Sequence, residues 1–268
     1  MKADNYRKTR AGITLFDQAA FEGMHRAGAV AAQILDGIAP HVFPGQTTAI
    51  INAFIEDQVK AAGALSATIG YKGYQHASCI SVNHVVCHGI PSDKKLNDGD
   101  ILNVDVTVIV DGWYGDTSRM YVAGDLSRKA ERLIKVTHDA LMKGIEAVKP
   151  GNTFGDIGYA IQSYVEAHRM SVVRDFCGHG LGQVFHAPPN VLHYGRPNTG
   201  SILEEGMFFT IEPMVNLGRA ETKVLVDNWT AVTRDKSLSA QFEHSVGVTA
   251  SGVEIFTLSP KDRFLTTY

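Results

Sequence analysis

The sequence predicts an α+β protein made of two related halves that face each other around a pseudo-twofold axis. Three features predict it: a helix–Pro-Gly–helix unit that occurs twice, strand-like alternation after each unit, and acidic residues at matching places in those strands. With 268 residues, the chain can bury a core as one large domain or two small ones. Because these acidic residues come from both halves and could form one site only together, we expect a single domain with an internal duplication, about 14–125 and 126–257.

Two Pro-Gly turns mark the repeat. Pro-Gly-Gln-Thr at 44–47 recurs as Pro-Gly-Asn-Thr at 150–153. Each turn is expected to join two amphipathic helices, 16–38 with 47–62 and 131–148 with 153–169. Each later helix begins at a threonine, whose hydroxyl can accept a backbone N–H as an N-cap. Two unrelated helical hairpins would explain these helices alone, but not the matching strands that follow them.

The segment 101–110 alternates in the manner of a β-strand, with one wholly apolar face and one face that carries Asp105 and Thr107. Asp-Gly at 111–112 is a strong signal for a two-residue hairpin turn. A hairpin with that turn pairs Thr107 with Asp116, because the pairing counts outward from the turn. Asp105 and Asp116 would then lie diagonally on one face, close enough to converge on one ion.

The second half repeats this arrangement with glutamates. Two strands are expected, and each carries an acid on its polar face: 207–215 with Glu212 and 240–249 with Glu243. A His-x-x-Pro sequence precedes the first strand acid of each half and begins at His88 and at His186. The order of these features is therefore the same in both halves.

Four carboxylates on facing strand surfaces repel one another unless a cation lies between them. A purely acid–base site, as in paired-carboxylate hydrolases, needs only two. His179, set between glycines at 177–182, is a fifth candidate ligand without a counterpart in the first half. Two Asp, two Glu and one His form an oxygen-rich set that suits Mn, Fe or Co and admits Zn. Bridging carboxylates would hold two such ions about 3.5–4 Å apart, where they could activate a water.

Composition excludes several classes of function. Lys plus Arg is 25 and Asp plus Glu is 28, so the net charge of −3 gives no sign of a nucleic-acid substrate or of an anionic membrane. Three cysteines, none in a C-x-x-C pair, favour a reducing compartment. No apolar run reaches the roughly 18 residues of a spanning helix, and the polar residues 1–8 do not resemble a secretory signal. We therefore expect a cytoplasmic protein.

The ordered set of candidate ligands resembles the five-ligand dimetal site of the pita-bread peptidases: Asp105, Asp116, His179, Glu212 and Glu243. The surrounding sequences are similar to those of type I methionine aminopeptidases, at 81–91, 115–118, 177–182, 210–214 and 239–244. The resemblance runs from about Thr14 to Thr257. It implies the pita-bread fold, in which two pseudo-twofold halves form a curved antiparallel sheet covered by helices.

By this resemblance, Asp105 is the bidentate ligand of one metal ion and Asp116 and Glu243 bridge the two ions. His179 and Glu212 bind the other ion, and Glu212 also matches the proton-transfer group of the family. The implied cofactor is therefore a pair of divalent ions (Fe, Mn, Co or Zn), among which the ligand types do not choose.

The resemblance also implies the residues that touch the substrate. His88 and His186 correspond to two histidines beside the metal ions, where an imidazole can stabilise a developing oxyanion or position the scissile amide. An apolar methionine pocket is expected from Thr68, Tyr71, Tyr74, Cys79, Phe185 and Trp229. Thr68 stands where bacterial relatives often have Cys, and His84 where an acid is common. We expect these two departures to affect pocket affinity or pH dependence and not the reaction.

The implied function is removal of the initiator methionine from nascent polypeptides whose second residue is small, by a ribosome-associated monomer. Two alternatives remain: an Xaa-Pro or broader aminopeptidase of the same fold, and a non-catalytic binding protein of that fold. Xaa-Pro and creatinase-like enzymes carry a large preceding domain, for which Asp105 comes too early. Type II methionine aminopeptidases carry a helical insert, for which the segment between His186 and Glu212 is too short.

Overall fold

The computed structural model describes residues 6–261 of the chain. Four α-helices lie in this part of the sequence: α1 (Gln18–Ile38), α2 (Thr48–Ala61), α3 (Arg128–Glu146) and α4 (Phe154–Ala167). Two short 3-10 helices are also present. One lies directly after α1, at Ala39–His41, and the other lies further along the chain, at Tyr71–Gly73. All four helices are where the sequence predicts them, and the mixture with antiparallel strands confirms the α+β class.

The helices begin at the caps that the sequence offers. The Thr47 hydroxyl oxygen accepts the N–H of Ile50 at 3.3 Å at the start of α2. At the start of α4, Thr153 and Asp156 form a reciprocal capping box. The two Pro-Gly turns therefore end in the same way in both halves, with a threonine that satisfies backbone donors left free by the first helical turn.

The long hairpin of the first half is β6 (Asp100–Val110) and β7 (Trp113–Ala123). Asp111 and Gly112 both have positive φ, 50° and 81°, as a two-residue hairpin turn of this kind requires. The register pairs Thr107 with Asp116, which confirms the prediction. Two short strands pair with β6 along the edge away from β7, namely β3 (Leu65–Ser66) and β4 (Cys79–Val82).

The main sheet of the second half has five antiparallel strands. Their order is β10 (Ala187–Val191), β9 (Gly178–Gly180), β11 (Phe208–Ile211), β16 (His244–Val248) and β17 (Val253–Ile255). Smaller sheets surround it. One contains β15 (Ser239–Gln241), β12 (Met214–Asn216) and β8 (Ser171–Val172), and another β13 (Thr222–Val224), β14 (Ala231–Thr233) and β5 (Val85–Cys87). A further pair is β1 (Arg7–Lys8) with β2 (Thr14–Leu15).

The two continuous strands predicted at 207–215 and 240–249 are wrong in one respect, because each is interrupted. The first divides into β11 and β12 around Glu212 and Pro213, and the second into β15 and β16 around Phe242 and Glu243. Proline has no N–H for a ladder, and the Glu243 N–H donates across to the Ser118 carbonyl of β7 at 3.1 Å. Both glutamates therefore lie at strand breaks, where the backbone changes partner.

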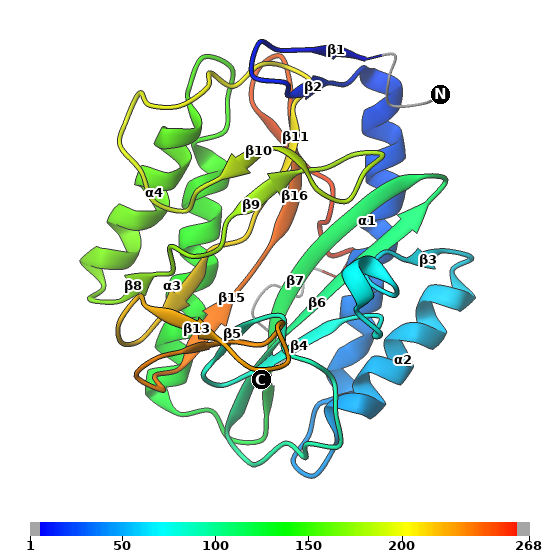
Figure 1. Cartoon of the computed structure of the whole chain (residues 1–268), viewed down its shortest axis with the longest axis vertical. Coiled ribbons are helices and arrows are strands. Elements are labelled where there is room, and N and C mark those ends of the chain that lie inside the picture. Colours follow the sequence, from blue (N-terminus) through cyan, green and yellow to red (C-terminus); the bar gives the residue numbers. More distant parts are fainter. Residues whose placement is uncertain (1–5, 262–268) are drawn as a thin grey trace.

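The sheets and helices form two packed groups. In Figure 1, α1 and α2 lie at the right and α3 and α4 at the left, with the strands between them. One apolar cluster joins α1 and α2 to β4, β6 and β7, and a larger one joins α3 and α4 to β11, β12 and β16. A Cβ on Gly115 would lie 2.3 Å from the Ala27 carbonyl oxygen, so α1 approaches β7 backbone to backbone.

The duplication into about 14–125 and 126–257 within one domain stays a prediction. No helix in the described range 6–261 is both long and apolar enough to cross a membrane. The interpretation of residues 1–8 rests in part on residues 1–5, which lie outside the described residues.

A buried ion pair ties α1 to the hairpin. The guanidinium Nη1 of Arg119 on β7 donates to Asp36 Oδ1 on α1 at 2.7 Å, and both side chains are buried. The Ser259 hydroxyl also donates to Asp36. A buried charge is tolerated only when it is paired. The helix α1 must therefore keep the position on the sheet in which Asp36 reaches Arg119.

We expect Asp36→Asn to lower the free energy of unfolding by about 3–5 kcal/mol, because it leaves a buried guanidinium without its anion. Urea unfolding followed by circular dichroism measures the change. Lys143→Gln, which breaks the exposed pair between Lys143 and Glu146, serves as the control and should cost under about 0.5 kcal/mol. Equal effects of the two substitutions would contradict the importance of the buried pair.

Candidate metal centre and substrate pocket

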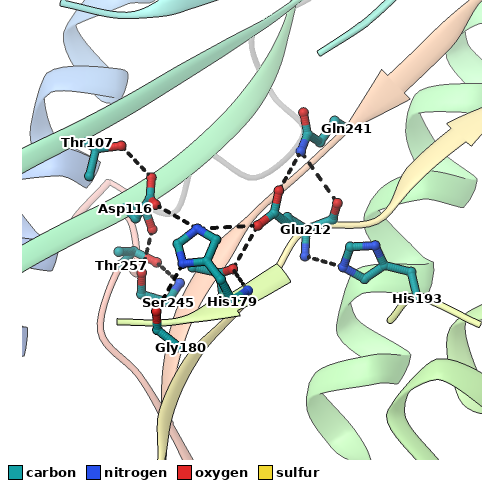
Figure 2. A network of polar contacts seen from close by, with 10 residues as sticks. Thr107, Asp116, His179, Gly180, His193, Glu212, Gln241, Ser245 and Thr257 are labelled. Atoms are coloured by element: carbon teal, nitrogen blue, oxygen red, sulfur yellow. Dashed lines mark hydrogen bonds and ion pairs between the residues drawn. The ribbon is translucent and has the colours of Figure 1, made fainter. Parts of the chain in front are cut away.

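The β6–β7 hairpin brings the first two predicted ligands together. Asp105 and Asp116 lie on the same face, since Thr107 pairs with Asp116 and Asp105 with Ser118. Asp116 is buried and its Oδ1 accepts the Thr107 hydroxyl at 2.7 Å. That bond fixes the Asp116 carboxylate and leaves Oδ2 directed toward the centre of the site (Figure 2).

His179 enters the site from β9, a strand that only glycines allow to lie so close to its neighbours. A Cβ on Gly178 would lie 2.3 Å from the Thr210 carbonyl oxygen, and one on Gly180 would lie 2.1 Å from that of Pro188. The His179 Nε2 lies 3.5 Å from Asp116 Oδ2 and 3.7 Å from Glu212 Oε1. Its Nδ1 lies 3.2 Å from the Gly180 carbonyl oxygen, so Nε2 is the nitrogen that faces the acids.

Glu212 is held at several points around the break between β11 and β12. The Thr210 hydroxyl donates to Oε1 at 2.8 Å, and the Gln241 amide lies 3.3 Å from Oε2. The backbone N–H of Glu212 donates to His193 Nε2 at 3.0 Å. Figure 2 shows these contacts around the carboxylate and the backbone.

Glu243 comes from the other break, between β15 and β16. Its N–H donates to the Ser118 carbonyl, and its carbonyl accepts the Thr117 hydroxyl at 2.7 Å. The side chain is buried. Since Ser118 and Thr117 belong to β7, the first half of the chain fixes the position of a predicted ligand from the second half.

Three of the five predicted ligands form a compact group. Asp116, His179 and Glu243 each offer a ligand atom, and these atoms lie within 4.8 Å of one another. Asp105 and Glu212 line the same pocket. The arrangement brings two aspartates, two glutamates and one histidine to one place from both halves of the chain.

The charges of this group are not balanced by the residues around it, and added positive charge would stabilise the carboxylates. Burial, and then the charge of neighbouring carboxylates, raises the pKa of Asp105 and of Glu243 well above the usual range. Burial is also the main reason that the pKa of Glu212 rises to about 7. Burial opposes the charge of His179, but its contact with Asp116 and the charge of Glu212 outweigh burial and raise its pKa to about 9. One imidazolium cannot neutralise four carboxylates, whereas divalent cations can.

A pocket of about 640 Å³ opens onto these acids. Its lining contains every residue predicted for catalysis, metal binding and substrate binding, including those expected to contact methionine: Thr68, Tyr71, Tyr74, Cys79, His88, Phe185, His186 and Trp229. The aromatic residues contact one another, with ring centroids 4.8 Å apart for Tyr71 and Phe185 and 4.9 Å apart for Tyr74 and Trp229. The pocket is therefore largely apolar above an acidic base.

Two of the three histidines that line the pocket, His88 and His186, have lowered pKa values. Burial, and then the charge of His179, lowers the pKa of His186 to about 4, and burial lowers that of His88. His186 stacks on Tyr71 with centroids 5.1 Å apart. His88 makes an edge contact with Trp229, with centroids 6.2 Å apart. A neutral imidazole keeps both a donor and an acceptor for a bound peptide.

Sequence reasoning missed several residues of the site. Lys72 lines the pocket, and its position between two predicted pocket tyrosines could have suggested this. Gln241 lies two residues before Glu243 on the strand face that the alternation already identified. His193 is different, because it is a single histidine outside the repeat and neither its spacing nor its context marks it.

Comparisons with known proteins agree with this geometry. The sequence model of metallopeptidase family M24 matches residues 22–250. The methionine aminopeptidase of Rickettsia prowazekii (strain Madrid E) is 58% identical over 250 residues, covering 93% of this chain and 96% of that protein. The methionine aminopeptidase of Escherichia coli (strain K12) is 50% identical over 243 residues, covering 90% and 92%.

A solved structure supports the same assignment. The crystal structure of methionine aminopeptidase from Rickettsia prowazekii superposes with a TM-score of 0.91 at 57% identity, covering 92% of this chain and 100% of that one. The likeness therefore extends over both halves, and it confirms the pita-bread fold that the motifs predict. The chain belongs to metallopeptidase family M24 and, within it, to the type I methionine aminopeptidases.

Proposed function

We propose that this chain removes the initiator methionine from polypeptides whose second residue is small, using two divalent metal ions. The observation that carries the proposal is the convergence of four carboxylates and one histidine at the base of an apolar pocket. A binding protein without catalysis would have no use for so many acids held against their mutual repulsion.

Asp105 would hold one metal ion, His179 and Glu212 the other, and Asp116 and Glu243 both. The donor set fits such ions because burial, and then the charge of neighbouring carboxylates, raises the pKa of Asp105 and of Glu243, and bound cations would favour their charged forms. When bound, divalent ions polarise a carbonyl group and lower the pKa of a water molecule, which is the chemistry that amide hydrolysis needs. Fe, Mn, Co and Zn all suit these donors.

The apolar part of the pocket would receive the methionine side chain. Tyr74 and Cys79 are buried at its wall, and Trp229 makes an edge contact with the Tyr74 ring. Aromatic edges and a thiol match the polarisable sulfur of an unbranched thioether. The Tyr74 hydroxyl donates to the Ser78 carbonyl at 2.9 Å, so the ring presents its apolar surface and not its hydroxyl to the pocket.

The histidines and Glu212 would act on the peptide bond. Neutral His88 and His186 can each donate an N–H, one to the carbonyl oxygen as negative charge develops and one to the scissile amide or leaving nitrogen. In this proposal the second residue of the substrate lies beside these two histidines, so a small residue (Gly, Ala or Ser) is preferred there. Glu212 would accept a proton and pass it to the leaving amine, the role that the resemblance to the family implies for it.

We propose further that the chain works as a cytoplasmic monomer on N-termini as they leave the ribosome. All the site residues come from one chain, so a second copy is not required to complete the pocket. Among the described residues the three cysteines are free thiols, as expected in a reducing compartment.

The substrate assignment predicts a selective, metal-dependent cleavage. Purified protein loaded with Mn²⁺ or Co²⁺ should remove Met from Met-Ala-Ser but not from Met-Lys-Ser, and should leave Ala-Ala-Ser and Ala-Pro-Ser intact. Mass spectrometry of the peptide mixture, beside a chelated control, measures this. Cleavage of Ala-Pro-Ser would transfer the function to the proline-directed branch of the fold, and no cleavage with any divalent metal would favour a binding protein.

Asp105→Ala should weaken metal binding and lower kcat/KM by more than about 100-fold. Removal of a metal ligand is expected to reduce activity more than removal of a side chain that only contacts a ligand, which costs about 10–100-fold. The same substitution should raise the melting temperature of the metal-free protein, since it removes a buried carboxyl whose pKa is raised. Calorimetric titration with Mn²⁺ and peptide kinetics measure both effects. Asp93→Ala, at an exposed position outside the pocket, is the matched control, and full metal-dependent activity of Asp105→Ala would refute the ligand assignment.

The stability of the metal-free protein should fall between pH 6.5 and pH 9. The folded chain raises the pKa of Glu212 from 4.5 to about 7 and that of His179 from 6.5 to about 9. Each group binds its proton more tightly when folded, so its stabilisation is full below the unfolded pKa and is lost as pH rises through the folded pKa. His186, with a lowered pKa, acts in the opposite direction only below its unfolded value of 6.5.

Thermal unfolding in chelator from pH 6.5 to pH 9 tests this pH dependence. Added Mn²⁺ should remove the decline, because metal binding replaces the protons that these groups otherwise need. A melting temperature that rises with pH in the metal-free protein would speak against the electrostatic description of the site.

A further inference from the structure

His193 lies just after β10 and is fully buried, with an exposed fraction of 0%. Its ring contacts the backbone of Glu212 and does not line the pocket. The Glu212 N–H donates to His193 Nε2 at 3.0 Å, as Figure 2 shows. This N–H lies at the break between β11 and β12, where Glu212 is paired with a side chain and not with a neighbouring strand.

The direction of this hydrogen bond defines the tautomer of the His193 ring. A backbone N–H can only donate, so Nε2 carries a lone pair and the proton of the neutral ring is on Nδ1. Nδ1 is buried and has no hydrogen-bond partner within residues 6–261. Such an unsatisfied buried donor is unfavourable, because it has given up its hydrogen bond to water. A histidine with this cost is expected only where its Nε2 accepts a hydrogen bond that an apolar side chain of similar volume could not accept.

We infer that His193 is a positioning residue whose Nε2 holds the backbone of Glu212 in the orientation that its carboxylate needs at the metal centre. The inference rests on the proposed role of Glu212. The Thr210 hydroxyl and the Gln241 amide contact the two carboxylate oxygens, but neither restrains the backbone N–H. His193 supplies that restraint at the point where the strand ladder is interrupted.

The contacts of Thr210 extend the consequence to His179. The Thr210 hydroxyl oxygen accepts the N–H of His179 at 3.0 Å and donates to Glu212 Oε1 at 2.8 Å. A shift of the Glu212 backbone would therefore disturb the contact between these two proposed ligands of one metal ion. We expect the loss to appear in metal affinity and kcat more than in KM, because His193 does not line the substrate pocket.

A pair of variants of similar length separates the acceptor from the volume of the ring. Gln in His193→Gln can place an oxygen near the position of Nε2, whereas Met in His193→Met has no comparable acceptor. His193→Met should lose about 10–100-fold in Mn²⁺ affinity or in kcat for Met-Ala-Ser, as outer contacts of metal ligands commonly do, with KM changed less than about threefold. His193→Gln should keep most of both.

Mn²⁺ titration by calorimetry, peptide kinetics and melting temperatures give the readouts. The same exchange at His41 is the control and should give no Gln–Met difference in metal affinity. His41 is half-buried, contacts the Phe54 ring at a tilt and does not line the pocket. Equal losses in His193→Gln and His193→Met, or no loss in either, would overturn the inference.

A measurement on the unaltered protein keeps the inference testable if the variants fold poorly. The ¹⁵N spectrum of histidine-labelled, metal-loaded protein should show His193 protonated at Nδ1 and unprotonated at Nε2. A proton on Nε2 would overturn the inference. Failure of the proposed function would appear as absent Met-Ala-Ser cleavage by the unaltered protein. Failure of the inference about His193 would appear separately, in the metal affinity of the variants and in the ring tautomer.

Discussion

The mutual repulsion of buried carboxylates is the constraint on which the rest of this structure depends. Acids from two hairpin strands and two strand breaks meet at the base of one pocket. Burial and repulsion together raise the pKa of Asp105, Glu212 and Glu243, and only part of the repulsion is relieved by His179. An arrangement so unfavourable by itself is maintained by the surrounding sheets, whose apolar clusters pack on the opposite side of the strands. It is suited to bind cations because the protein alone leaves it short of positive charge.

The first half of the site could be predicted from sequence because its geometry is local. Asp111 and Gly112 determine the turn, the turn determines the register, and the register determines that Asp105 and Asp116 share a face. The glycines around His179 were equally informative, since a close backbone approach is a common reason for glycine on both sides of a histidine. In each case a few neighbouring residues carry the whole geometric consequence.

The second half could be predicted only in outline, because its geometry depends on distant partners. Alternation identified the acidic faces that carry Glu212 and Glu243, but it predicted continuous strands. The breaks arise because the Glu243 N–H pairs with β7 and the Glu212 N–H pairs with His193, neither of which is near in sequence. The repeat, the alternation and the glycines identified the five candidate ligands, and the resemblance to a family assigned a role to each of them. It did not supply the side chains behind them, since His193 and Thr210 act through hydrogen bonds that leave no pattern in one sequence.

The contact between Glu243 and β7 has a consequence for the order in which the site comes into being. Asp105 and Asp116 are synthesised early, whereas Glu243 lies close to the end of the described residues and is fixed by the backbone of Ser118. During translation the centre therefore remains incomplete until Glu243 has emerged and its segment has met β7. In the proposed enzyme, a partly synthesised copy would lack the last carboxylate, so hydrolytic competence would begin with the completed fold.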